Sequence, residues 1–327
     1  MRNDYPASHV VIATWTHNGE KTIKRAIDSI LNQTYGNFTY YIIDNECTDS
    51  TPEIIKAYAK ADPRIRLLKR DKNALNLLLF DWAINSIDIN YDYFAVLDDD
   101  DEYKPDFLEK ILTFAEHNDL DIAHCGWNIF KWNNQLSMYV FNNIKAIAND
   151  LIVNNSDEFD LSYPTYREFA VSMCGAVYRS SILKKADLKT HPHNDLVQGS
   201  DGLFNALVYK NAEKAGVMAK SLFNRYERFD SITFKITHKR LQQCQILHDA
   251  WYEFLITKCG FVSQRNLEFM YNRYEMYMKY IASIIMSVDD DVAVKQKYVT
   301  ELLQNELAHM FVDVVLNHIT NMTTKNI

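Results

Sequence analysis

The stretch Tyr93-Phe94-Ala95-Val96-Leu97-Asp98-Asp99-Asp100-Asp101-Glu102 decides the fold, because a mainly apolar run is followed at once by five acidic residues. The apolar run has the composition of a buried strand. Five acids at a strand end repel one another unless a cation is present. Mg²⁺ and Mn²⁺ take oxygen ligands and bridge carboxylates to substrate phosphates. The other interpretation is a solvated acidic loop or a helix start, where acids favour the helix dipole.

Upstream of this stretch, expected strands alternate with expected helices. The strands are 9–13, 40–43 and 64–68, and the helices are 19–31, 52–59 and 76–86. This alternation predicts a largely parallel sheet with both faces covered. Ligands of such sheets bind beyond the carboxyl ends of the strands, so the informative loops are 14–19, 44–50 and 98–103.

Downstream, the pattern predicts a helix over 107–117, a strand over 121–125 and a hairpin around Asn133-Asn134. Beyond Ile236 the chain is expected to be wholly helical, and its Tyr- and Met-rich stripe is typical of a core or a subunit contact. We therefore expect a catalytic domain over 1–235, with a nucleotide-sugar half to about 105 and an acceptor half from about 106. A helical region over 236–327 follows.

The composition is that of a packed globular protein, with 47% hydrophobic and 24% charged residues in 327. A net charge of −8 argues against a nucleic-acid partner. The five cysteines form no Cys-x-x-Cys pair, so we expect reduced thiols and no zinc. The sequence shows neither a signal-peptide-like start nor a long apolar run, which favours the cytoplasm.

Four segments resemble, in order, the motifs of glycosyltransferase family 2, an inverting, metal-dependent family with the GT-A fold. They are His9-Val10-Val11-Ile12-Ala13-Thr14-Trp15-Thr16-His17-Asn18, Ser29-Ile30-Leu31-Asn32-Gln33-Thr34-Tyr35, Ile42-Ile43-Asp44-Asn45-Glu46-Cys47-Thr48-Asp49 and Leu97-Asp98-Asp99-Asp100-Asp101-Glu102-Tyr103-Lys104-Pro105. The resemblance covers roughly residues 10–233. It implies an α/β, Rossmann-like GT-A fold, with a mostly parallel sheet flanked by helices and an α-helical C-terminal extension.

The resemblance also implies which residues contact the donor and the metal. Asp98 and Asp100 would hold a divalent cation, Mn²⁺ or Mg²⁺, while Asp101 could instead hold the motif by hydrogen bonds. Asp44 and Asn45 would contact the base, although an aspartate after a strand also forms turns. The residues expected on the donor side are Thr14, Trp15, Asn18, Asp44, Asn45, Asn73, Asp98, Asp99 and Arg228.

A second carboxylate resembles the general base of the family. Asp201 lies in Gly199-Ser200-Asp201-Gly202-Leu203-Phe204, where the resemblance places the group that deprotonates the acceptor hydroxyl. The alternative for Asp201 is a helix N-cap. Asp195 is the reserve candidate for the base.

Two positions depart from the family pattern. Phe80 stands where a basic residue is expected near the nucleotide, and Arg228 stands where a histidine is expected. Arginine can neutralise phosphate charge but does not bind a metal. Arg225 and Arg228 are therefore candidates for binding the leaving diphosphate, with ordinary surface arginines as the alternative.

Together these features predict an inverting glycosyltransferase of the hexosyl or N-acetylhexosaminyl class. The expected donor is a nucleotide sugar, UDP-linked by preference, and the expected acceptor is a hydroxyl of a glycan or lipid-linked glycan in polysaccharide or glycoconjugate biosynthesis. The helical region could contact the inner face of a membrane or a second copy of the chain.

The alternative function is a catalytically degenerate domain that only binds or scaffolds partners. A glycoside hydrolase would need two carboxyls flanking one bond, and a nucleotidyltransferase would normally carry a Gly-rich loop that residues 14–19 lack.

Overall fold

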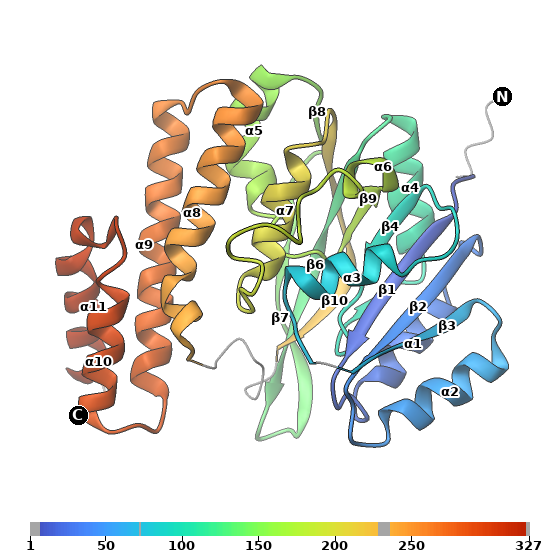
Figure 1. Ribbon diagram of the computed structural model, residues 1–327, viewed down its shortest axis with the longest axis horizontal. Coiled ribbons are helices and arrows are strands. Elements are labelled where there is room, and N and C mark those ends of the chain that lie inside the picture. Colours follow the sequence, from blue (N-terminus) through green and yellow to red (C-terminus); the bar gives the residue numbers. More distant parts are fainter. Residues whose placement is uncertain (1–6, 72, 228–235, 325–327) are drawn as a thin grey trace.

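The computed structural model describes residues 7–71, 73–227 and 236–324, and its centre is a mixed α/β sheet (Figure 1). The sheet has ten strands, with the order β3-β2-β1-β4-β9-β6-β10-β5; β7 pairs with β6 and β8 with β10. The strands are β1 Val10–Thr16, β2 Phe38–Asn45, β3 Ile65–Arg70, β4 Tyr93–Val96, β5 Glu102–Tyr103, β6 Ile122–Asn133, β7 Met138–Lys145, β8 Leu151–Val153, β9 Ala176–Arg179 and β10 Ala215–Glu227.

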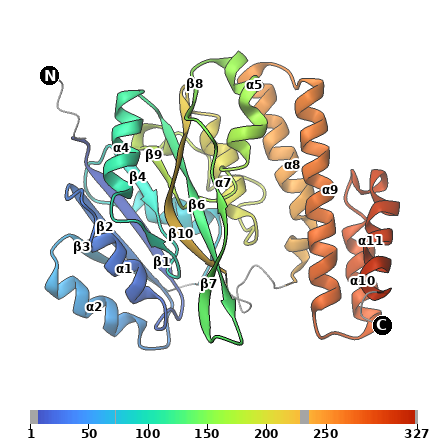
Figure 2. The same ribbon diagram turned by 180° about the vertical axis from the view of Figure 1, so that it is seen from behind.

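Helices cover both faces of this sheet. Those of the first 210 residues are α1 Ile23–Leu31, α2 Thr51–Ala61, α3 Leu77–Asn85, α4 Phe107–His117, α5 Ser156–Arg167, α6 Ser180–Leu183 and α7 Ser200–Tyr209. Helices α3 and α7 lie in front of the sheet in Figure 1, whereas α1, α2 and α4 lie in front in the reverse view of Figure 2. Both faces of the sheet are therefore buried, which explains why strands such as β1 and β2 are buried at every residue.

The predicted α/β fold is confirmed, and so is its largely parallel first half. Strands β1, β2, β3 and β4 all run parallel. The second half is mixed, because β9 lies antiparallel between β4 and β6. The strand expected over 121–125 is longer in the structure and continues to Asn133 as β6. A turn connects β6 to the antiparallel strand β7, so the predicted hairpin is present.

The chain beyond residue 236 is helical, as expected. Its elements are α8 His238–Cys259, α9 Gln264–Ser287, α10 Val292–Leu302, the 3₁₀ helix η2 Ala308–Met310 and α11 Val312–Thr324. Helix α8 packs on α7 and α5, and its Trp251 and Phe254 belong to the main core. A second core joins α8 to the last helices through Cys244, Met278 and Phe311. Among the described residues, no helix is both long and apolar enough to cross a membrane.

Candidate active site

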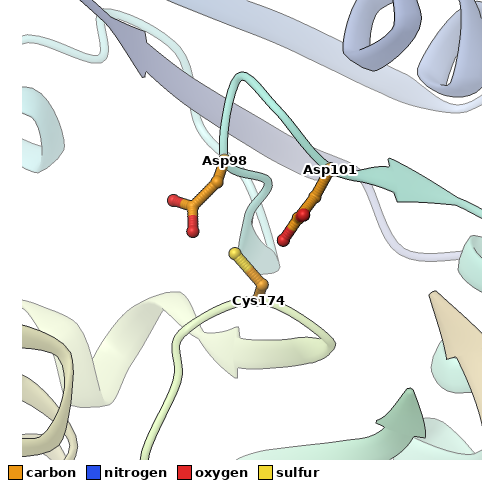
Figure 3. Close-up of side chains that lie close together, drawn as sticks. All are labelled: Asp98, Asp101 and Cys174. Atoms are coloured by element: carbon orange, nitrogen blue, oxygen red, sulfur yellow. The ribbon is translucent and has the colours of Figure 1, made fainter. Parts of the chain in front are cut away.

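The acidic loop lies at the carboxyl edge of the sheet, between β4 and β5. Asp98 is half-buried and Asp101 is buried, and both approach Cys174, which is on the loop before β9. One ligand atom from each of the three residues lies within 4.8 Å of the other two. Figure 3 shows the sulfur of Cys174 between the two carboxylates. In the described parts of the chain, this is the only group of at least three acidic, histidine or cysteine side chains gathered so closely.

Crowded negative charge perturbs the titration of these groups. Burial, together with the charges of Asp201 and Asp100, raises the pKa of Asp98 to about 8. Burial and the charges of Asp100 and Asp98 also raise the pKa of Asp101 well above its usual value. Burial raises the pKa of the Cys174 thiol, so this sulfur is neutral at pH 7. A cation would relieve the repulsion, and the oxygen donors suit a hard divalent ion better than the protonated thiol does.

Asp101 is held by partners on β10. Its Oδ1 accepts a hydrogen bond of 2.8 Å from the backbone N–H of Tyr226. Burial alone would lower the pKa of Arg225, but Asp101 and Glu227 raise it, so its guanidinium stays charged beside the acids. These contacts match the alternative in which Asp101 fixes the loop by hydrogen bonds. Asp100 is half-buried in the same turn and lies outside the group of three.

Asp99 joins the acidic loop to the loop after β1. The Thr16 hydroxyl donates to Asp99 Oδ2. Gly19 lies directly over this pair, and a Cβ at residue 19 would clash with both Thr16 Oγ1 and Asp99 Oδ2. The absence of a side chain at Gly19 therefore lets the two loops meet.

Asp201 lies in the first turn of α7 and faces the acidic loop. The N-cap of α7 is Gly199, at φ 85°, without a side-chain cap, so the N-cap alternative for Asp201 is wrong. Burial raises the pKa of Asp201 to about 6, opposed by a hydrogen bond from the Met173 backbone and by the charge of Arg225. The reserve candidate Asp195 is not a member of the group of three and forms an ion pair at the surface with the half-buried Lys239, at 3.4 Å.

Thr14 and Trp15 are buried at the end of β1. The Thr14 hydroxyl donates to the Leu97 carbonyl at 2.7 Å and accepts from Tyr40 Oη at 2.9 Å. The Trp15 ring packs on Phe80, with ring centroids 4.7 Å apart. Phe80 is 2% exposed, so the residue that replaces the expected basic one is part of the core.

The expected base-contacting residues are the last two residues of β2. Asp44 Oδ1 accepts from the Cys47 N–H at 2.9 Å, which is the turn-forming contact considered above. Asn45 is fully buried, and its amide group donates to Asn73 Oδ1 at 3.0 Å and to the Ala74 carbonyl at 3.2 Å.

Asn18 links the loop after β1 to the loop after β2. It adopts φ 57°, and its Oδ1 accepts from the Thr48 N–H at 2.8 Å. The structure therefore brings together the carboxyl ends of β1, β2 and β4 and the loops that follow them, and these segments carry all the predicted donor-side residues except Asn73 and Arg228. Asn73 joins them through Asn45, and Arg228 lies outside the described residues.

The sequence interpretation missed Cys174, Tyr226 and Arg25 as members of the site. Arg25 on α1 donates a hydrogen bond to the Asp100 carbonyl. Tyr226 follows the diphosphate candidate Arg225, but its contact with Asp101, 125 residues away in the sequence, depends on the fold. Arg25 is 75 residues from its partner, and no local pattern marks it.

Solved structures with the same architecture identify the class of fold. The structure matches S. aureus TarS residues 1–349 in complex with UDP, with a TM-score of 0.58, 16% identity, and coverage of 95% of this chain and 89% of that one. It also matches the mannosyltransferase PcManGT from Pyrobaculum calidifontis in complex with GDP-Man and Mn²⁺, with a TM-score of 0.53, 13% identity, and coverage of 98% and 87%. The fold is that of the GT-A glycosyltransferases, as predicted.

The sequence then places the chain within this class. The model of glycosyl transferase family 2 matches residues 10–185, more than half of the chain. The chain belongs to glycosyl transferase family 2. It is also 25% identical over 234 residues to the glycosyltransferase GlyA of Streptococcus pneumoniae serotype 4, covering 70% of this chain and 32% of that protein. The chain thus spans about a third of the length of that relative.

Proposed function

We propose that the chain transfers a sugar from a nucleoside diphosphate sugar to a hydroxyl of a glycan acceptor, with inversion at the anomeric carbon. The observation that carries this proposal is that Asp98 and Asp101 converge at the carboxyl edge of a family 2 fold, with Asp201 facing them. The UDP complex of TarS and the GDP-Man and Mn²⁺ complex of PcManGT support a nucleotide-linked donor. A UDP-linked hexose or N-acetylhexosamine is the donor that we would test first.

A divalent cation fits the residues of this site. Carboxylate oxygens are the donors that Mn²⁺ and Mg²⁺ prefer. Burial and the neighbouring carboxylates raise the pKa of Asp98, and a cation would neutralise the charge of those carboxylates. By the family resemblance, Asp98 and Asp100 would hold the ion. Asp101, which the structure gathers with Asp98, would support the site through its hydrogen bond from Tyr226. When bound, the ion stabilises the negative charge that develops on the diphosphate.

Asp201 is the proposed base, and its position in the first turn of α7, facing the acidic loop, supports this role. Its carboxylate takes the proton of the acceptor hydroxyl as the acceptor oxygen forms a bond to the anomeric carbon. The bond from that carbon to the phosphate oxygen breaks, and the nucleoside diphosphate leaves with the electron pair. Arg225, close to Asp101 and Asp98, adds positive charge beside the acids. Attack from the side opposite the leaving group accounts for inversion.

We also propose that the chain divides as its sequence indicates, into a catalytic part to about residue 235 and a helical part after it. Within the catalytic part, the nucleotide-sugar half extends to about residue 105 and therefore ends just after the acidic loop. The second core between α8, α9 and α11 supports this division, whereas the main-core residues of α8 link the two parts.

The test compares turnover with binding. UDP-glucose and UDP-N-acetylglucosamine are incubated with Mn²⁺ and a panel of glycan acceptors, and released UDP is measured. Asp201→Asn should lower turnover by about 10² to 10⁴-fold, while UDP affinity stays within a few-fold, because only the proton acceptor is lost. Wild-type turnover in Asp201→Asn would exclude it as the base. Binding of a nucleotide sugar without turnover on any acceptor would favour the degenerate binding domain instead.

A further inference from the structure

Arg25 on α1 contacts the acidic loop from the side of the sheet that α1 covers. Its guanidinium Nη2 donates a hydrogen bond to the main-chain carbonyl of Asp100. The guanidinium carbon also lies 3.8 Å from the centroid of the Tyr226 ring, which is a close cation–π contact. One side chain thereby joins α1, the acidic loop and the end of β10.

Tyr226 contacts the next two residues of the same loop. Its backbone N–H donates to Asp101 Oδ1 at 2.8 Å, and its hydroxyl donates to Glu102 Oε1 at 2.8 Å. Arg25 and Tyr226 together therefore hold Asp100, Asp101 and Glu102 through three separate groups.

The hairpin of β6 and β7 supports Tyr226 from behind. The Phe130 ring stacks on Tyr226 with centroids 5.1 Å apart and an interplanar angle of 18°. Tyr139 of β7 makes an edge contact with the same ring at 4.9 Å. Asn224 pairs with Glu102 in the sheet, and its side chain donates to Glu102 Oε1 at 2.6 Å. The ring under the guanidinium is therefore fixed by strands on either side.

We propose that Arg25 and Tyr226 are positioning residues that set the geometry of the acidic loop for a divalent cation bound together with a nucleoside diphosphate. This inference rests on the function proposed above. Groups that orient metal-binding carboxylates from behind determine metal affinity, because an unsupported loop must first be ordered when the ion binds. Arg25 and Tyr226 themselves need not touch the ion, the nucleotide or the sugar.

The chemistry of the two side chains makes the inference specific. A planar guanidinium can lie flat on an aromatic ring and donate a hydrogen bond at its edge, whereas a lysine ammonium has no such plane. Arg25→Lys should therefore keep the charge and lose part of the effect. Tyr226→Phe keeps the ring and the N–H but loses the bond to Glu102, so it should have a smaller effect than Arg25→Ala.

The test is a Mn²⁺ titration of nucleotide binding, with UDP, GDP, ADP and CDP as the probes. For the nucleotide that wild type binds, the Mn²⁺ concentration that gives half-maximal binding is measured in wild type, Arg25→Ala, Arg25→Lys and Tyr226→Phe. We expect Arg25→Ala to raise this concentration by about 10- to 100-fold, while nucleotide affinity at saturating Mn²⁺ stays within a few-fold of wild type. The matched control is Lys24→Ala, because Lys24 is the adjacent residue of α1 and pairs with Asp28 at 2.7 Å. Nucleotide binding by Lys24→Ala should show the same Mn²⁺ dependence as wild type.

Each outcome bears on one claim. Unchanged Mn²⁺ dependence in Arg25→Ala and Arg25→Lys would overturn the inference and leave the proposed function intact. An equal loss of nucleotide affinity at all Mn²⁺ concentrations would also overturn it, because that result indicates general structural damage. If Arg25→Ala does not fold, Arg25→Lys and Tyr226→Phe decide the question. If wild type binds none of the four nucleotides with Mn²⁺, the proposed function fails and the inference fails with it.

Discussion

At the residue scale, Gly19 shows how tightly two loops of the site are joined. A side chain at this position would displace Thr16 or Asp99. Gly19→Ala should lower the free energy of unfolding by about 1–3 kcal/mol, which is the usual cost of overpacking, and should weaken Mn²⁺-dependent nucleotide binding. Urea unfolding and calorimetry measure the two effects.

Gly36→Ala is the control for this prediction. A Cβ at Gly36 meets no atom within 4 Å, and its φ lies outside the left-handed region. Its effect on stability should therefore stay within about 0.5 kcal/mol. Equal effects of the two substitutions would show that the contact between Thr16 and Asp99 is not what requires glycine at residue 19.

His124 makes stability depend on pH. Burial lowers its pKa from 6.5 to about 3, because the charged ring is desolvated beside Tyr209 and Tyr178. Below about pH 6.5, His124 binds a proton in the unfolded chain, whereas in the folded chain it binds a proton only near pH 3. Stability that is complete above pH 6.5 is therefore lost on acidification, by about 1.4 kcal/mol per pH unit.

The variant His124→Leu should remove this contribution. Between pH 7.5 and 5.0, wild type should lose about 2 kcal/mol more stability than the variant does. Urea unfolding at the two pH values measures the difference, in which the contributions of other groups cancel. A variant that loses as much stability as wild type would contradict a neutral, buried His124.

Single residues were predictable where a motif carried them. Asp98 and Asp201 were expected from their segments, and the structure places them near each other. The bonds of Thr14 to Leu97 and of Asn45 to Asn73 were not predictable, because each partner is on another strand or loop. The roles of the donor-side residues toward a nucleotide remain predictions.

At the element scale, local signals located the helices, although the helix expected over 19–31 begins only at Ile23. The expected helix over 107–117 agrees with α4, since its apolar residues recur on one buried face. The expected strand over 121–125 fell short of β6, which continues to Asn133. Its outer half is stabilised by β7 and by β10, and the latter is about 90 residues away in the sequence. Only the hairpin turn was visible locally.

The cap of α3 gives an element-scale prediction. The Asn76 side chain accepts hydrogen bonds from the N–H groups of Leu78 and Leu79, at 3.1 and 3.3 Å. Asn76→Ala should cost about 1 kcal/mol of stability, because these two donors lose their partner, whereas Asn76→Asp should retain most of it. Chemical unfolding of both variants measures the difference. Equal losses would show that side-chain volume rather than capping matters at residue 76.

At the scale of the whole molecule, α8 joins the helical part to the sheet. Trp251 is 1% exposed, and its Nε1 donates to the Gly202 carbonyl of α7 at 3.2 Å, next to Asp201. Its ring also lies under the Arg167 guanidinium, at 4.4 Å. The alternation of strands and helices predicted the parallel half of the sheet. The antiparallel insertion of β9 depends on pairing between distant segments, which no local pattern encodes.

We expect the two parts of the chain to unfold as one unit, because α8 contributes to the main core. Trp251→Phe leaves tryptophans only before residue 235, namely Trp15, Trp82, Trp127 and Trp132. In this variant, the fluorescence transition reports the first part, and circular dichroism is weighted toward the helices. The two transitions should coincide. A helical signal that melts separately would contradict a shared core.

The central claim is that the acidic loop binds a nucleoside diphosphate through a divalent cation, and calorimetry tests it most directly. Nucleoside diphosphates and nucleotide sugars are titrated into wild type and Asp100→Ala, with and without Mn²⁺. We predict that one nucleotide binds wild type only with Mn²⁺ and that Asp100→Ala loses this binding. Binding that needs no metal and survives in Asp100→Ala, or no binding under any condition, would contradict the claim.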